Sequence, residues 1–134
     1  MSQGSLQLVQ GVYRAFAEAN IPSLLSLFSD DMHWYEAESL PYADGNPYVG
    51  ADQIMTGVFA RLQNDWESFW VNPDEFLDMG STVVVLGHYQ GQGRASGAKL
   101  TTAFVHVWRV RDDQICEYRE FTDTARFLSV LTPQ

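Results

Sequence analysis

The sequence has too few cysteines for disulfide bonds or a cysteine-bound metal. Cys116 is the single cysteine in 134 residues, so it has no partner within the chain, and no two cysteines can form a zinc site. This cysteine content is typical of proteins in a reducing compartment. We therefore expect a cytoplasmic protein whose function does not depend on disulfides.

Basic residues and long apolar runs are also scarce. Eight Lys and Arg residues against 17 Asp and Glu residues give a net charge of −9, which would repel the phosphate backbone of a nucleic acid. No apolar stretch reaches the roughly 18 residues of a membrane span, and the N-terminus lacks the basic and apolar regions of a secretion signal. The expected partners therefore include no nucleic acid and no membrane, and secretion is not expected.

The sequence does contain a large share of bulky apolar side chains. Hydrophobic residues make up 46% of the chain and aromatic residues 13%, which excludes a disordered protein. A chain of 134 residues is long enough to bury one core and too short for two. We expect a single domain over residues 1–134, with some of its rings lining one cavity.

The first half of the chain has helical spacing around one strand. Apolar residues recur every three or four positions from Leu6 to Ala19, which predicts a helix with one buried face. A second helix starts at Ile21 and a third at Gly50. Between them, Met32 to Glu36 predicts a strand, and Ala37 to Tyr48 predicts a loop whose apolar residues would suit a lid over a pocket mouth.

The second half alternates with period two, which predicts strands joined by tight turns. A helix follows the last strand. The predicted elements are strands at Trp66 to Phe76, Val83 to Gln92, Lys99 to Val110 and Gln114 to Thr122, and a helix at Thr124 to Leu131.

This order of elements predicts an α+β domain with helices on one face of an antiparallel sheet. The other face must be covered as well, because several strands are apolar on both sides. Val105 and Val107, for example, alternate with Phe104 and Trp108. A homodimer built on the sheet is the economical explanation.

Two segments resemble a known superfamily. Leu24 to Glu36, LLSLFSDDMHWYE, resembles the helix-turn-strand opening of the SnoaL-like polyketide cyclases and the ketosteroid isomerases, and Phe104 to Thr124, FVHVWRVRDDQICEYREFTDT, is similar to their paired terminal strands. The resemblance covers nearly the whole chain. It implies the cone of the nuclear-transport-factor-2-like (NTF2-like, cystatin-like) fold, in which a strongly curved antiparallel sheet and three to four helices on its concave face enclose one apolar pocket. Because the superfamily includes isomerases, cyclases, hydrolases and non-catalytic binders, the resemblance specifies the fold and not the activity.

Alternation assigns side chains to the pocket face once Trp34 and Glu36 are taken to point inward. A bulge would reverse part of the assignment. The inward positions are then Val84, Leu86, His88 and Gln90 on one strand, Phe104, His106 and Trp108 on the next, and Cys116, Tyr118, Glu120 and Thr122 on the last.

Glu36 and His106 are the first candidate catalytic residues. The resemblance implies that Glu36 stands where ketosteroid isomerases carry their proton-moving carboxylate, and that His106 stands where they carry an oxyanion-stabilising acid. A carboxylate facing an apolar cavity has a raised pKa and becomes a better base near neutral pH, and an imidazole N–H can donate to a developing enolate. The alternatives are a solvated glutamate at the end of a strand and a core histidine. The isomerases' first-helix tyrosine aligns with Val12, and Tyr13 is one position away.

Glu120 and His88 are the second pair of candidates. The resemblance to epoxide hydrolases places His88 and Gln90 where those enzymes hold an arginine and an aspartate, and Glu120 where they hold a last-strand acid. His88 and Glu120 would together supply a base and a proton donor. Alternatively, Glu120 pairs with a basic residue on the rim. Both histidines with one glutamate are also a possible facial metal triad, but the superfamily is mostly metal-free, and we expect neither a metal nor a cofactor.

The remaining candidates are apolar and aromatic residues that suit a flat ligand, although many such rings in a small domain serve ordinary packing. The candidate ligand-binding residues are Trp34, Val12, Tyr13, Phe59, Gln90, Phe104, Trp108 and Tyr118.

The sequence therefore supports two hypotheses of different classes. The leading one is a cofactor-independent SnoaL-like enzyme that transfers protons on a hydrophobic carbonyl-containing or polycyclic small molecule, by isomerase, cyclase or hydrolase chemistry. Glu36 or Glu120 would be its base, and His106 or His88 the polar partner. The competing one is a non-catalytic module that binds a small ligand or dimerises. Burial of the four polar groups beside an open cavity would favour the enzyme.

Overall fold

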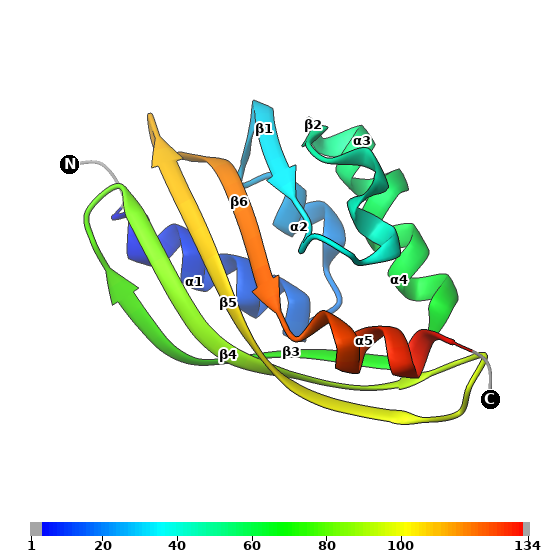
Figure 1. The fold of residues 1–134 in the computed structure, drawn as a ribbon. Coiled ribbons are helices and arrows are strands. Elements are labelled where there is room, and N and C mark those ends of the chain that lie inside the picture. The colour runs from blue at the N-terminus through cyan, green and yellow to red at the C-terminus, as the bar shows by residue number, and fades with distance from the viewer. Residues whose placement is uncertain (1–3, 133–134) are drawn as a thin grey trace.

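One sheet of six strands organises residues 4–132, the part of the chain that the computed structural model describes. Its strands are β1 (Phe28–Tyr35), β2 (Tyr48–Val49), β3 (Trp66–Asp78), β4 (Thr82–Gly93), β5 (Lys99–Arg111) and β6 (Gln114–Thr122). Their order across the sheet is β2-β1-β6-β5-β4-β3. The long strands β3, β4 and β5 curve strongly, and the sheet forms a half-open cone (Figure 1).

The strand pairs are antiparallel with one exception. β1 runs parallel to β6, with Trp34 opposite Tyr118 and Tyr35 opposite Arg119. The expectation of an antiparallel sheet was therefore wrong for this pair, and the sheet is mixed. A parallel pair needs a long connection, and here most of the domain lies between the two strands.

Helices cover the concave side of the sheet (Figure 1). α1 has two overlapping apolar rows, Leu8 with Val12 and Val9 with Tyr13, and all four side chains are buried. Short α2 is capped by Asn20, which accepts a hydrogen bond from the Ser23 amide. The helices are α1 (Ser5–Ala17), α2 (Ile21–Leu25), α3 (Ala51–Ile54), α4 (Ala60–Asp65) and α5 (Thr124–Leu131), with a π-helical stretch, Met55–Phe59, joining α3 to α4.

The segment predicted as a lid is part of the core instead. Leu40, Tyr42 and Tyr48 are all buried, and the Tyr42 hydroxyl donates to Asp65 at the end of α4. The Tyr48 ring lies so close to Gly57 in the π-helical stretch that a Cβ there would clash with it. The prediction of a lid was wrong because these rings fasten the loop to α4.

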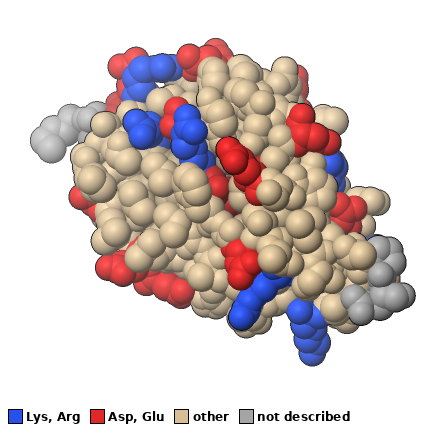
Figure 2. All heavy atoms as spheres, viewed as in Figure 1, with Lys and Arg blue, Asp and Glu red and all other residues tan. Residues whose placement is uncertain are grey.

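The α+β class and the curved sheet with helices on its concave face are confirmed. The last helix, α5, begins where predicted, because Asp123 caps it by accepting from the Arg126 amide. No helix within residues 4–132 is long and apolar enough to cross a membrane. On the face shown in Figure 2, basic side chains lie beside acidic ones and do not form a separate patch.

Candidate functional site

A chain of hydrogen bonds runs through the interior, and His106 of β5 is its centre. The His106 ring is 2% exposed, and both of its nitrogens have a tyrosine partner. The Tyr13 hydroxyl lies 2.6 Å from Nδ1, and the Tyr89 hydroxyl of β4 lies 2.6 Å from Nε2. Trp108 donates its indole N–H to Tyr13 at 2.9 Å, and Tyr89 donates to Glu120 of β6. Five side chains from four elements thus form one connected polar network inside an apolar cone.

The direction of each hydrogen bond in this chain follows from which groups can donate and which can accept. Trp108 can only donate, so Tyr13 accepts from it and directs its own proton to His106 Nδ1. Nε2 therefore carries the imidazole proton and donates to Tyr89, which donates in turn to Glu120. Every donor then has an acceptor, provided that Glu120 is a carboxylate.

Burial keeps the middle of the chain neutral. It holds the pKa of His106 well below its ordinary value, because an imidazolium ion would be desolvated among aromatic rings. Burial likewise raises the pKa of Tyr13 and of Tyr89 well above the ordinary value of a phenol. His106 is therefore a neutral relay of hydrogen bonds and carries no charge itself.

Two glutamates lie together at the end of this chain. Glu36, the residue that follows β1, and Glu120 of β6 are each 6% exposed. The Glu120 carboxylate accepts from the Ala37 amide at 3.1 Å, which places it against the backbone beside Glu36. Glu36 accepts from the Trp34 indole at 2.7 Å. The structure thus brings together three of the four predicted catalytic residues, Glu36, His106 and Glu120.

The two carboxyl groups differ in the surroundings that shift their pKa values. Burial and the neighbouring Glu120 raise the pKa of Glu36 well above its ordinary value, against the smaller effect of the Trp34 hydrogen bond. Burial also raises the pKa of Glu120, but its hydrogen bonds from Tyr89 and from the Ala37 amide oppose the rise. The surroundings therefore oppose ionisation more strongly at Glu36 than at Glu120, which makes Glu36 the natural acid and Glu120 the natural carboxylate of the pair.

The pair lies between two hollows. Inside the cone, Glu36 and Glu120 line a cavity of about 30 Å³ whose other walls include Trp34, Phe59 and Tyr118. Outside, the same two glutamates line an open groove of about 380 Å³ at the edge of β1 and β6. The two glutamates, although nearly buried, therefore lie between the interior cavity and the surface groove.

His88 and Gln90 do not belong to this site. Both lie on the outer face of β4, where His88 pairs with Asp74 and Gln90 accepts a hydrogen bond from Asn72. The inward residues of β4 are Val83, Val85 and Tyr89, so the predicted alternation was wrong by one residue along this strand. It was wrong because β4 is apolar on both faces from Val83 to Leu86, so the sequence there does not show which residues point inward.

The alternation is also broken at the start of β6. A bulge opposite Arg109 and Val110 turns Ile115 into the core, and Cys116 is only half buried. The predicted inward position of Cys116 was therefore wrong, whereas Tyr118 and Glu120 point inward as predicted. On β5 the predicted set of Phe104, His106 and Trp108 is buried throughout.

Tyr89 is the polar residue of the site that sequence reasoning missed. The sequence signal for Tyr89 was a glycine two residues before it and another two residues after it, Gly87 and Gly91. These three residues share one face of β4, and the glycines leave room there for bulky side chains of other strands. A Cβ at Gly87 would collide with the Phe104 ring, and one at Gly91 would crowd Trp66. Glycines at two-residue steps therefore mark the inward face of β4, on which Tyr89 stands between them.

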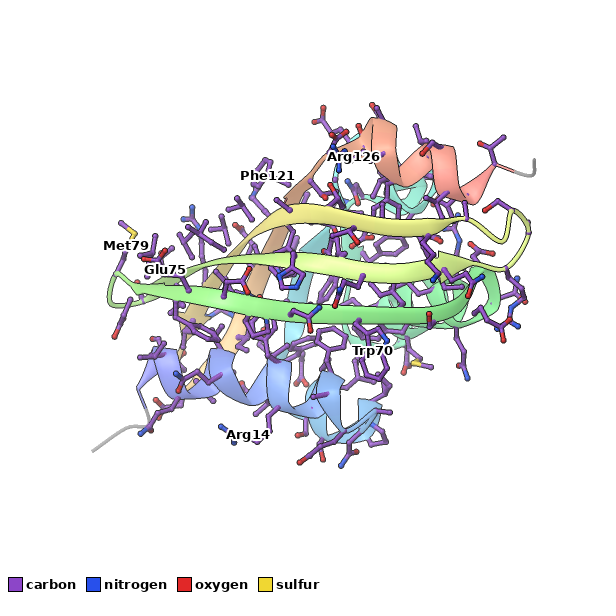
Figure 3. All side chains as sticks on the ribbon, turned by 90° about the horizontal axis from the view of Figure 1, so that it is seen from below. Arg14, Trp70, Glu75, Met79, Phe121 and Arg126 are labelled. Atoms are coloured by element: carbon purple, nitrogen blue, oxygen red, sulfur yellow. The ribbon has the colours of Figure 1, made fainter. Side chains whose placement is uncertain are left out.

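The predicted ligand-binding residues divide into three groups. Trp34, Phe59 and Tyr118 line the interior cavity. Val12, Tyr13, Phe104 and Trp108 are buried behind it, and Phe104 stacks on the His106 ring at 3.8 Å between centroids. Gln90 is exposed. Trp70 of β3 is 56% exposed and lies on the outer side of the strands in Figure 3, away from the cavity.

The possible metal triad is not assembled. His88 and His106 lie on opposite faces of the sheet, because one is outward on β4 and the other inward on β5. Among the described residues, no group of three His, Cys, Asp or Glu side chains is close enough to hold a metal ion.

Comparison with known proteins places this site in a family. A family model of the SnoaL-like domain matches residues 9–118. The chain belongs to the SnoaL-like family. No curated protein matches the sequence.

Solved structures extend the likeness of this SnoaL-like domain to the whole NTF2-like fold. An NTF2-like protein from Burkholderia thailandensis E264 is 29% identical over 98% of this chain and 99% of its own, with a TM-score of 0.93. TerC, co-crystallised with polyporic acid, is 25% identical over 95% of this chain and 97% of its own, with a TM-score of 0.84. A protein from Catenulispora acidiphila with a ketosteroid isomerase-like fold is 20% identical over 95% of this chain and 93% of its own, with a TM-score of 0.78. The last likeness shows the fold alone.

Proposed function

We propose that this SnoaL-like domain is a cofactor-independent enzyme that transfers a proton on a hydrophobic carbonyl-containing or polycyclic small molecule. One observation carries the proposal. Two nearly buried glutamates share an open groove, and one of them ends a hydrogen-bonded chain through Tyr89 and His106. Carboxyl pairs with unequal surroundings supply an acid and a base at the same pH.

The roles follow from the hydrogen bonds. The Glu120 carboxylate removes a proton from the carbon next to the substrate carbonyl, and the electron pair of that C–H bond moves toward the carbonyl oxygen. The carboxylic acid of Glu36 donates its proton to that oxygen, so an enol forms and no charged intermediate accumulates. Protonation at another carbon or attack on a second carbonyl then gives isomerase or cyclase chemistry. Tyr89 and His106 position the Glu120 carboxylate and are not themselves consumed.

The experiment is deuterium incorporation at the α-carbon of 2-tetralone, followed by ¹H NMR in D₂O. We expect the wild-type protein to accelerate exchange, and Glu120→Gln and Glu36→Gln each to lower the rate by about 10²-fold or more, because each removes one proton-transfer group. Glu75→Gln, on the exposed part of β3 (Figure 3), is the matched control and keeps the wild-type rate.

The pH dependence gives a second readout. Exchange needs Glu120 as a carboxylate and Glu36 as an acid, so only the singly protonated pair is active and the rate follows a bell-shaped pH profile. Burial raises the pKa of both glutamates and so moves this profile to higher pH. The rate rises as the pair loses its first proton, above the ordinary carboxyl range, and falls as Glu36 loses the second at still higher pH. Equal rates for wild type and both glutamine variants at every pH would sink the proposal.

A non-catalytic module is the second candidate, and the small interior cavity favours it. About 30 Å³ accommodates roughly one or two water molecules and no organic ligand. In that case the aromatic cone serves only stability, and the two glutamine variants would change no rate while the protein still bound a ligand or a second copy of itself.

A further inference from the structure

The chain leaves the sheet at Glu36. The last residue of β1, Tyr35, pairs with Arg119 of β6, and the pairing of β1 with β2 ends at Trp34. Within residues 4–132, therefore, no strand pairing holds the backbone of Glu36. A group that transfers protons must be held to within about 0.5 Å of its working position, so this backbone needs another restraint.

The side chain of Asn46 supplies that restraint. Its Oδ1 accepts a hydrogen bond from the Glu36 amide at 2.9 Å, and its Nδ2 donates to the Glu36 carbonyl at 2.9 Å. Two residues that face each other in an antiparallel strand pair exchange hydrogen bonds in the same way. One side chain, reaching back ten residues, thus takes the place of a strand partner and fixes the peptide groups on both sides of Glu36.

The same side chain also acts on the second glutamate. The Glu36 carbonyl and the Ala37 N–H belong to one peptide group. Asn46 donates to the carbonyl of this group, and the N–H of the group donates to the Glu120 carboxylate at 3.1 Å. A peptide group that accepts at its oxygen becomes a stronger donor at its nitrogen, because hydrogen bonds in a row polarise one another. Asn46 therefore directs and strengthens a hydrogen bond to Glu120 through a single peptide group.

The loop that carries Asn46 is itself held in place. The Asn46 amide donates to the Ala43 carbonyl at 3.2 Å, which closes the 3₁₀ turn Pro41–Gly45 before it. Arg61 of α4 donates to Asp44 in this turn at 2.8 Å. A side chain can position another residue only if its own backbone is fixed, and here the backbone is fixed to α4.

We propose that Asn46 is a positioning residue, which places the carboxyl groups of Glu36 and Glu120 for proton transfer. The inference rests on the proposed function, because this placement matters for a rate only if the pair transfers protons. Misplacing a reacting group by about 1 Å can cost about 10²-fold in rate. A residue that served the loop alone would change stability and leave the rate of the folded protein as it is.

The test compares Asn46→Ala with Asn72→Ala in the full-length protein. Asn72 donates to Gln90 on the outer face, so its loss removes a hydrogen-bonded asparagine of the same size away from the pair. In 2-tetralone exchange we expect Asn46→Ala to lower kcat by about tenfold or more with KM within about twofold of wild type, and Asn72→Ala to keep both values. Asn46→Ser is a second variant. Serine suits a turn but is too short to reach both the amide and the carbonyl of Glu36, so the same fall in kcat is expected.

A second readout needs no turnover. ¹³C NMR follows the titration of the Glu120 carboxyl group in each variant. Without Asn46 the Ala37 N–H is a weaker donor to the Glu120 carboxylate, so the pKa of Glu120 should rise and the midpoint of its titration should move to higher pH. Tyr89 and Arg61, which also act on the pair, are the same in every variant. The midpoint should stay at its wild-type position in Asn72→Ala.

The outcomes separate this inference from the proposed function. Wild-type kcat in both Asn46 variants would overturn the inference, and so would an unmoved Glu120 midpoint in both. An equal fall in kcat in Asn72→Ala would also overturn it, because the effect would then not depend on the contact with Glu36. A wild-type protein that does not accelerate exchange would refute the proposed function instead, and the Glu120 midpoint alone would then decide whether Asn46 positions the pair.

Discussion

The two faces of the sheet treat histidine in opposite ways. On the concave face, His106 is buried, neutral and hydrogen-bonded through both nitrogens to tyrosines. On the outer face, His88 of the neighbouring strand is partly exposed and makes one hydrogen bond with Asp74. The residue type is the same, and only the direction of the side chain differs. The contrast shows that the concave face builds polar groups into a network, while the outer face leaves them to solvent.

The largest effect should come from cutting the network. Tyr89→Phe removes the hydroxyl between His106 and Glu120 and leaves an imidazole N–H and a carboxylate oxygen buried without their partner. We expect the free energy of unfolding to fall by about 1–3 kcal/mol, the cost of unsatisfied buried polar groups. Urea denaturation followed by tryptophan fluorescence measures it.

Tyr35→Phe is the control for that variant. It removes the same hydroxyl from a partly exposed ring on the edge of the groove, where water can take its place. Its unfolding free energy should stay within about 0.5 kcal/mol of wild type. An equal loss in both variants would mean that the concave network contributes no more than a surface hydroxyl.

A second prediction concerns what covers the outer face. Half-buried Leu86, Val105 and Val107 lie there, and we propose that a second copy of the chain packs on them. Val107→Glu would introduce a charge into the interface and raise the dimer dissociation constant by about tenfold or more, equivalent to about 1.4 kcal/mol. Sedimentation equilibrium measures the change.

Val49→Glu makes the matched comparison for the dimer. Val49 is an exposed valine on β2, at the far edge of the sheet from β3, and should not affect association. A wild-type protein that stays monomeric at every concentration would refute the homodimer.

The smallest effect is expected on the outer face of β4. His88→Gln removes an exposed contact with Asp74, and polar contacts at the surface contribute little. The unfolding free energy should change by less than about 0.5 kcal/mol, again by urea denaturation. A loss as large as that of Tyr89→Phe would remove the distinction between the two faces.

Much of the fold was predictable because the signals were local. Period-two alternation placed β6 at its observed bounds, and the turn at Asp112 and Asp113 adopts the left-handed backbone that a tight hairpin needs. Helix α5 follows its capping aspartate as predicted. The parallel pairing of β1 with β6 was not predictable in this way, because it joins segments about eighty residues apart.

The site was predictable only where alternation was unbroken. Trp34, Glu36, His106 and Glu120 were placed inward correctly, because no bulge interrupts the pairing of β5 with β6 between Phe104 and Arg109. The run of apolar residues at the start of β4 removed that signal, and a bulge reversed it for Cys116. The one-residue error placed His88 inward, and its neighbour Tyr89 was therefore taken to point outward and was not recognised as part of the site.

The fixed donor order of the interior chain has an electrical consequence. The N–H and O–H dipoles of Trp108, Tyr13, His106 and Tyr89 all point along the chain with their positive ends toward Glu120. Aligned dipoles reinforce one another in a medium of low polarity, so together they stabilise negative charge at Glu120. When Glu120 accepts a proton, the row of hydrogen bonds loses the negative charge that orients it. Protonation at Glu120 therefore changes the hydrogen bonding of the aromatic interior as far as Trp108.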